Sequence, residues 1–160
     1  MAFELSPADA SFLDSAPMRF VFPMRLAARA DEVWQGLTGD ATLGWVHGLS
    51  VRWTSPRPYG VGSTRIAAGG FGAVRLYETF FRWEEGRRYS FYAHAANLPV
   101  YRRFVEDYLV EPAADGGCTF TWTFAAQPRG ARGVAAVLGA AQRPVFAAMA
   151  RDTRRHFGTR

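Results

Sequence analysis

The feature that most constrains the fold is a long amphipathic segment at the end of the chain, residues 131–157. At 3.6 residues per turn, apolar side chains form one narrow stripe and arginines lie on the opposite side. The stripe comprises Val134, Leu138, Ala141, Val145 and Met149, and the arginines are Arg132, Arg143 and Arg154. A helix of this length runs about 40 Å. Pro144 predicts a kink, because proline removes a backbone hydrogen bond, and the stripe then drifts toward Phe146 and Phe157. We therefore expect a helix with a buried apolar stripe and exposed arginines, following a curved partner.

Almost everything before this segment has the period-two pattern of β-strands. The expected strands are 18–26, 49–54, 63–67, 73–83, 88–94, 104–111 and 118–125. A helix beginning near Asp31 and ending near Gly39, and a second short helical turn over 43–46, follow the first strand. Pro23 places that strand near a sheet edge. We predict an α+β fold, a curved antiparallel sheet closed around one long helix, with an internal cavity between them. Residues 1–16 form a surface extension, and 17–160 form a single domain.

Composition excludes several classes of protein. A chain of 160 residues forms one domain with a proper core. The net charge is +5 and every basic residue is arginine, but the arginines are scattered and no recognition motif accompanies them, so we expect no nucleic-acid partner. Cys118 is the only cysteine, so an intrachain disulfide is impossible. The start of the chain lacks a positively charged secretory signal, and the longest apolar run is too short to span a bilayer. These observations predict a soluble cytoplasmic protein, either a monomer or a homodimer.

The standard signatures of catalysis are missing from the sequence. It has no Gly-x-Ser-x-Gly elbow, phosphate loop, dinucleotide fingerprint or His-Glu-x-x-His motif. His47, His94 and His156 are far apart and lack the spacing of metal ligands. We therefore expect neither a metal nor a cofactor.

Strand alternation supplies the most informative candidate, Glu106. Two successive strands each place their apolar side chains on one face. In the strand 104–111 these side chains are Phe104, Tyr108 and Val110, and in the strand 118–125 they are Cys118, Phe120, Trp122 and Phe124. Glu106 shares the face of the first set. If that face points inward, the carboxylate loses solvation, its pKa rises, and it becomes a candidate catalytic acid or base. Two alternatives remain: a bulge turns Glu106 outward, or an arginine neutralises it in a structural pair.

A second charged pair follows from the geometry of the hairpin. If its turn is centred between Phe71 and Gly72, Arg65 lies opposite Glu78. Glu78 shares a face with Leu76 and Phe80, so it also points inward if they do. Arg65 is then either an anion-binding group of the cavity or one half of a structural salt bridge with Glu78. Six aromatic residues with polar atoms, Trp45, Trp53, Tyr77, Tyr92, Tyr101 and Trp122, fit the lining of a pocket or a core equally well.

Several sequence runs resemble the SRPBCC (START-like) superfamily, and within it the bacterial polyketide cyclase/dehydrase-like branch. The runs 51–65, 78–88 and 106–108 carry this resemblance, 31–38 is similar to the family's first helix and 118–122 to its last strand. It covers about residues 17–157. The resemblance implies a helix-grip fold, in which a seven-stranded antiparallel sheet with two short helices after its first strand wraps around the C-terminal helix and leaves a hydrophobic cavity. The family spans lipid carriers, ring-closing enzymes and ubiquinone-binding chaperones, and this branch implies no bound metal.

We therefore expect the chain to bind, and by extension transport, a hydrophobic small molecule such as a lipid, an isoprenoid or an aromatic polyketide. The expected cavity lining comprises Trp45, Trp53, Arg65, Tyr77, Glu78, Phe80, Tyr92, Phe104, Tyr108, Phe120, Trp122, Val145 and Met149. The alternative is a polyketide cyclase/aromatase or dehydratase in which Glu106 and a tyrosine or histidine move protons. A third class is an accessory protein that presents a ligand or partner surface at the basic helix end, where Arg151, Arg154 and Arg155 cluster near His156. That end is either a contact for acidic lipids or a solvated face.

Overall fold

A computed structural model describes residues 1–131 and 133–160. Its elements are β1 Phe3–Glu4, α1 Ala10–Ser15, β2 Met18–Leu26, α2 Ala30–Thr38, β3 Ser50–Trp53, β4 Thr64–Gly69, β5 Val74–Glu84, β6 Arg88–Ala96, β7 Tyr101–Pro112, β8 Cys118–Pro128 and α3 Val134–Phe157. The seven strands expected from alternation are β2 to β8, and each differs from its expected bounds by a few residues at most.

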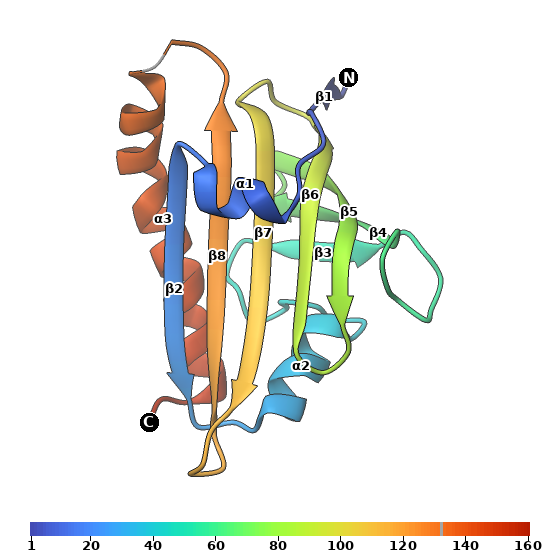
Figure 1. The fold of residues 1–160 in the computed structure, drawn as a ribbon, viewed down its shortest axis with the longest axis vertical. Helices are drawn as coiled ribbons and strands as arrows, with labels where there is room; N and C mark the ends of the chain where they lie inside the picture. Colours follow the sequence, from blue (N-terminus) through green and yellow to red (C-terminus); the bar gives the residue numbers. More distant parts are fainter. Residues whose placement is uncertain (132) are drawn as a thin grey trace.

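The seven strands form one antiparallel sheet in the order β2-β8-β7-β6-β5-β4-β3. α3 lies alongside β2 and β8 on one face, while α1 crosses β7 and β8 on the other (Figure 1). The strand that contains Pro23 is an edge strand, as expected, because proline has no amide hydrogen for a second neighbour. The predicted helix-grip fold is confirmed.

The first 16 residues contain two short elements that the sequence pattern does not predict. β1 pairs with the end of β6, with Phe3 opposite Ala96. It occupies the edge of β6 that β7 leaves free, because β7 pairs only with residues 88–92 of β6. α1 begins after Asp9, whose side chain accepts a hydrogen bond from the Ser11 amide at 3.0 Å. Phe12 and Leu13 of α1 are buried on the outer face of the sheet. These residues cover apolar surface that β7 and β8 would otherwise expose.

Of the two short helices expected after the first strand, the structure forms one. α2 begins at Ala30, and the Arg29 amide before it donates to the Glu32 side chain at 2.8 Å. Val33, Trp34 and Leu37 of α2 are buried, as the helical spacing predicts. Residues 40–45 form turns rather than a second helix. These turns place Leu43, which has a positive φ of 56°, in the core.

The predicted face of the C-terminal helix is partly wrong. Val134, Leu138 and Met149 are half-buried, but Ala141 and Val145 are exposed, and Val145 is 57% exposed. The side that contacts the sheet is set by Phe146, whose ring stacks on Phe124 with centroids 4.1 Å apart. Arg143 is exposed as expected, whereas Arg154 is half-buried and donates to the Pro23 carbonyl at 3.2 Å. Arg132 lies outside the described residues. The bend at Pro144 stays a prediction.

The core lies between the inner face of the sheet and α3. Its largest fully buried side chains include Trp122, Tyr89, Tyr108, Phe120 and Arg65, so this interior is aromatic but not purely apolar.

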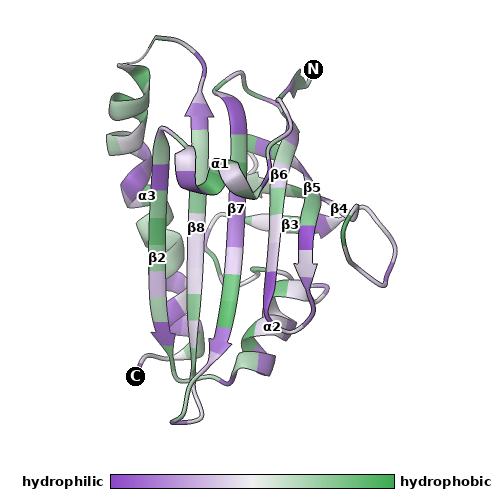
Figure 2. Ribbon diagram, viewed as in Figure 1, coloured by the Kyte–Doolittle hydropathy of each residue, from purple (hydrophilic) through white to green (hydrophobic). Residues whose placement is uncertain are grey.

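Hydrophobic and hydrophilic residues alternate along α3 (Figure 2). Within the part of the chain that the structure describes, no helix is long and apolar enough to cross a membrane.

Candidate functional site

A cavity of about 360 Å³ lies between the sheet and the middle of α3. Its apolar lining comprises Leu43, Leu49, Val51, Ala67, Val74, Leu76, Val100, Phe104, Phe124, Val145, Phe146 and Met149. Its polar lining comprises Arg65, Glu78, Tyr101, Glu106, Tyr108 and Gln142, with the backbone of Gly69 and Gly70 at one side. The cavity exists because α3 packs mainly on β2 and β8, whereas residues of β3 and β4 line the cavity without packing directly on α3.

Arg65 and Glu78 form an ion pair in the wall of this cavity. The predicted register is confirmed: they lie directly opposite each other on β4 and β5. Arg65 Nε donates to Glu78 Oε2 at 2.5 Å, and each side chain is 1% exposed. Burial raises the pKa of the Glu78 carboxyl, and the adjacent guanidinium opposes that rise. Burial also disfavours the charge of Arg65, but Glu78 and the hydroxyl groups of Tyr89 and Tyr108 outweigh it and hold the pKa of Arg65 well above its usual value.

Aromatic rings enclose the Arg65 guanidinium on several sides. Its central carbon lies 4.3 Å from the ring centroid of Phe91. Four further centroids, those of Trp53, Phe80, Tyr89 and Tyr108, lie 5.0–5.8 Å from it. Ring faces attract a cation electrostatically, so this environment replaces part of the lost hydration. Arg65 is therefore fixed in place before any ligand binds.

Glu106 points into the cavity from β7. It lies opposite Phe124 in a regular stretch of the β7–β8 ladder, so the alternative of an outward-turning bulge is wrong. Trp122 Nε1 and Tyr108 Oη donate to its Oε2 at 2.7 and 2.9 Å. Burial, reinforced by the negative charge of Glu78, raises the pKa of Glu106 to about 8 despite these hydrogen bonds and the charge of Arg65. No arginine of the described residues forms a salt bridge with it. Glu106 thus combines cavity access with a pKa close to neutral pH.

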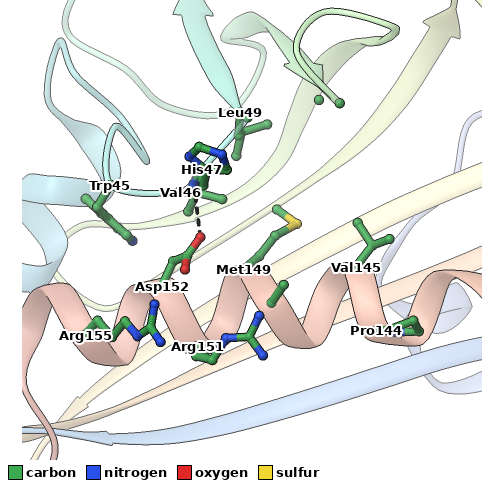
Figure 3. A pocket seen from close by; sticks show the side chains of 14 residues that line it. Trp45, Val46, His47, Leu49, Pro144, Val145, Met149, Arg151, Asp152 and Arg155 are labelled. Atoms are coloured by element: carbon green, nitrogen blue, oxygen red, sulfur yellow. Dashed lines mark hydrogen bonds between the residues drawn. The ribbon is translucent and has the colours of Figure 1, made fainter.

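An outer groove of about 770 Å³ continues from the cavity along α3. The groove and the cavity share Leu49, Gly69, Gly70, Val145 and Met149. Figure 3 shows Trp45, His47 and Leu49 facing Met149 and Asp152 of α3 across this groove. The His47 amide donates to Asp152 Oδ2 at 3.0 Å, which ties the two sides together. The shared residues place the groove directly beside the cavity, where Val145 is exposed to solvent.

Seven of the fourteen expected site residues line the cavity: Arg65, Glu78, Phe104, Glu106, Tyr108, Val145 and Met149. Trp45 lines the outer groove instead, where its Nε1 donates to Thr153 Oγ1 at 3.0 Å. Trp53, Phe80, Phe120 and Trp122 belong to the packed core beside the cavity and do not line it. Trp53, for example, lies between the rings of Tyr59 and Phe80. These four aromatic residues shape the cavity wall from behind.

The expectation that Tyr77 and Tyr92 line the cavity is wrong, because both lie on the outer face of the sheet. Tyr77 neighbours Glu78 on β5 and so points to the opposite side, where its ring lies 6.4 Å from that of His94. Tyr92 packs on the outer face with Phe81 and the α1 cluster. Strand alternation alone would have excluded Tyr77, because Leu76 and Glu78 face inward.

Several lining residues were absent from the expected set. Alternation identifies Leu76 with Glu78, and Ala67 with Arg65, since residues two apart share a face. The hydroxyl of Tyr101, on β7, donates a hydrogen bond to Oε1 of Gln142, on α3, at 2.5 Å. That contact depends on how the helix is rotated, which the helical period did not determine. Among the described residues, no cluster of three or more His, Cys, Asp or Glu side chains is placed to hold a metal ion.

Comparison with known families decides the relationship of this chain to other proteins. The family described as "Polyketide cyclase / dehydrase and lipid transport" matches residues 19–158. The chain belongs to this family. The resemblance to the SRPBCC superfamily, and to its polyketide cyclase/dehydrase-like branch, is thereby confirmed.

Proteins similar to this chain in sequence or in fold are found in several organisms. An uncharacterized protein of Mycobacterium tuberculosis is 36% identical over 117 residues, which are 72% of this chain and 69% of that protein. Among solved structures, a START superfamily protein from Mycobacterium smegmatis has a TM-score of 0.70 at 8% identity, covering 87% of this chain and 96% of that one. Ginseng major latex-like protein 151 from Panax ginseng has a TM-score of 0.64 at 12% identity, covering 87% and 96%. At these identities the structures share the fold with this family member.

Proposed function

We propose that this polyketide cyclase/dehydrase-like protein binds a hydrophobic small molecule in the cavity between its sheet and α3. The observation that carries the proposal is the cavity itself, about 360 Å³ with a mostly apolar lining and a few polar groups, most of them on the sheet side. This is the usual composition of a small-molecule site. The family description, which includes lipid transport, supports the same conclusion. Lipids, isoprenoids and aromatic polyketides all have the required apolar surface.

Burial of apolar surface supplies the driving force. Transfer from water contributes about 25 cal/mol per Å² of apolar area. Phe104, Phe124 and Phe146 offer large rings to the ligand from β7, β8 and α3. Because the rings of Phe124 and Phe146 already stack on each other, and Phe104 packs against Tyr101, the site requires little reorganisation on binding.

Native mass spectrometry of the purified protein tests the proposal. We expect a bound species that dissociates on activation, or, after delipidation, one-to-one adducts with added 1-decanol. The same measurement on a delipidated protein of similar size and unrelated fold gives the level of non-specific adducts. If delipidated protein that is folded by circular dichroism shows only that level with 1-decanol and other uncharged lipophilic compounds, the proposal is wrong.

An enzymatic role of the cyclase or dehydratase kind is the second candidate, and one observation favours it. A carboxyl group with a pKa of about 8 that faces a cavity has the properties of a general acid or base. Glu106→Gln preserves the shape of the side chain and removes the titrating proton. If the protein is an enzyme, this variant loses ring closure or dehydration of a linear polyketide analogue and keeps its affinity for the analogue. Equal rates in the wild type and the variant would contradict a catalytic Glu106.

A further inference from the structure

The two oxygens of Glu106 have different surroundings. Oε2 accepts both hydrogen bonds, from Trp122 Nε1 and from Tyr108 Oη. Within residues 1–131 and 133–160, no hydrogen bond reaches Oε1, although Glu106 is only 6% exposed and lines the cavity. A carboxyl oxygen has two acceptor lone pairs, so Oε2 is already saturated. Oε1 is therefore the atom that meets a ligand.

This asymmetry determines where the proton of the neutral acid lies. With both lone pairs of Oε2 in use, a protonated Glu106 carries its hydrogen on Oε1. The raised pKa of about 8 makes this neutral form the main one at pH 7. Because Glu106 lines the cavity, this O–H group is a hydrogen-bond donor that a ligand in the cavity can reach. An acceptor atom on the ligand is the chemical complement of this donor.

The charges around Glu106 add a second constraint. The titratable and charged groups that face it are Arg65 on β4, Glu78 on β5, Tyr89 on β6, and Tyr101 and Tyr108 on β7. The α3 residues that line the cavity are Gln142, Val145, Phe146 and Met149, and none of them has an ionisable side chain. Arg65, the one cation in the lining as far as residues 1–131 and 133–160 define it, is already compensated by Glu78 at 2.5 Å. An anionic ligand would therefore add an uncompensated negative charge beside buried side chains, which is unfavourable.

The shape of the site sets the direction of entry. Arg65, Glu78 and Tyr108 are each 1% exposed, so the polar groups lie at the deep end. Val145, 57% exposed, and the backbone of Gly70 lie where the cavity meets the outer groove. A ligand with one polar group therefore enters with that group first and leaves its apolar part between Val145 and Met149.

We propose that the cavity selects an uncharged lipophilic carbonyl compound, whose oxygen accepts a hydrogen bond from Glu106 Oε1–H, and that it disfavours the corresponding carboxylate. This inference rests on the proposed function and names the chemical class of its ligand.

Three probes of equal chain length separate the possibilities: 2-decanone, 1-decanol and decanoate. Their dissociation constants are measured by titration calorimetry from pH 6 to pH 9. We expect the affinity for 2-decanone to fall about tenfold between pH 7 and pH 9, because the ketone only accepts hydrogen bonds and the ionised Glu106 only accepts them too. The alcohol donates to the ionised form, so its affinity changes less than threefold. Decanoate binds at least tenfold more weakly than 2-decanone at pH 7.

Glu106→Gln tests the role of the residue without removing a donor. The amide group of glutamine donates to the ketone at every pH, so the variant keeps the affinity for 2-decanone at pH 7 and loses its pH dependence. Glu111→Gln, on the same strand but exposed, is the matched control and keeps the wild-type profile. Circular dichroism verifies that both variants fold.

Two kinds of negative result have different meanings. Decanoate binding as tightly as 2-decanone, or a flat pH profile of the wild type for 2-decanone, overturns this inference and leaves the proposed function standing. Absence of binding by all three probes to the folded protein contradicts the proposed function, and the inference fails with it.

Discussion

Arg65 and Glu78 are the residues at which this core departs most from an ordinary hydrophobic interior. Both charges are withdrawn from water and depend on each other. We expect Glu78→Gln to lower the free energy of unfolding by about 3–5 kcal/mol, because it leaves the guanidinium as an uncompensated buried charge. Replacing both residues, Arg65→Met with Glu78→Leu, recovers most of this loss. Urea denaturation measures both effects.

The exposed pair between Arg57 and Asp40 provides the control for that experiment. Asp40→Asn removes one charge of a solvent-exposed pair and leaves the urea midpoint nearly unchanged. A loss in Glu78→Gln no larger than that in Asp40→Asn would show that the buried pair is not needed for stability.

Glu106 makes the stability of the protein depend on pH. Its pKa is about 8 in the folded protein against an ordinary value of 4.5. Between these two values the folded state binds more protons than the unfolded state, so this group stabilises the fold below pH 4.5 and loses that contribution as pH rises to 8. The slope is up to about 1.4 kcal/mol per pH unit. Glu106→Gln removes it, so the difference between wild type and variant, followed by urea denaturation, declines from pH 5 to pH 8 and flattens above. Parallel curves would contradict the assignment.

For individual residues, the sequence predicts which face of the sheet a side chain lies on wherever side chains alternate strictly along a strand. Alternation along the strands predicts that Glu106 faces inward and that Arg65 lies opposite Glu78, and the structure confirms both. It does not predict the partners of Glu106, because the approach of Trp122 and Tyr108 depends on side-chain rotamers. Residue type predicts the cavity lining less well than alternation does. Tyr77 is an aromatic residue with a polar atom, as many pocket residues are, but its position on β5 places it on the outer face of the sheet.

Among the elements, α3 is the one whose existence was predicted and whose orientation was only partly predicted. Alanine is frequent along it, so several neighbouring stripes are almost equally apolar. The contact of Phe146 with Phe124 and Phe20 selects the one that faces the sheet. The sequence does not show this choice, because it depends on where the aromatic residues of β2 and β8 are placed.

Two helical glycines provide a test of how α2 and α3 are packed. A Cβ atom on Gly36 would lie 2.9 Å from Trp45 Cζ3 and 3.0 Å from Phe157 Cζ, whereas one on Gly139 would meet Phe20 Cζ at 3.7 Å. Gly36→Ala should therefore destabilise the protein by about 1–3 kcal/mol through overpacking. Gly139→Ala should stabilise it by about 0.5–1 kcal/mol, the ordinary gain in a helix. Thermal and urea unfolding measure both. The same sign for the two substitutions would contradict the packing described here.

For the whole molecule, the sheet depends on α3 as the cover of its inner face. Phe20, Phe124 and the cavity walls would all meet water without it. Deletion from residue 131 onward should abolish cooperative thermal unfolding and the dispersed amide signals of a folded chain. A truncated protein that still unfolds cooperatively would refute this dependence.

The overall architecture was predictable because one long helix and seven strands leave few arrangements, and the family resemblance selects one of them. The extent of the cavity was not predictable in the same way. It depends on α3 packing against β2 and β8 but not against β3 and β4, which is a property of the assembled sheet rather than of any segment.

The central claim is that this cavity holds a hydrophobic molecule, and filling it tests the claim directly. Ala67 lines the cavity, and its neighbour Ala68 on β4 points to the other face of the sheet. The measurement is titration of 1-decanol into the wild type, Ala67→Trp and Ala68→Trp, each verified as folded. The account predicts that Ala67→Trp weakens binding at least tenfold while Ala68→Trp binds like the wild type. Wild-type affinity in Ala67→Trp would place the ligand elsewhere and contradict the account.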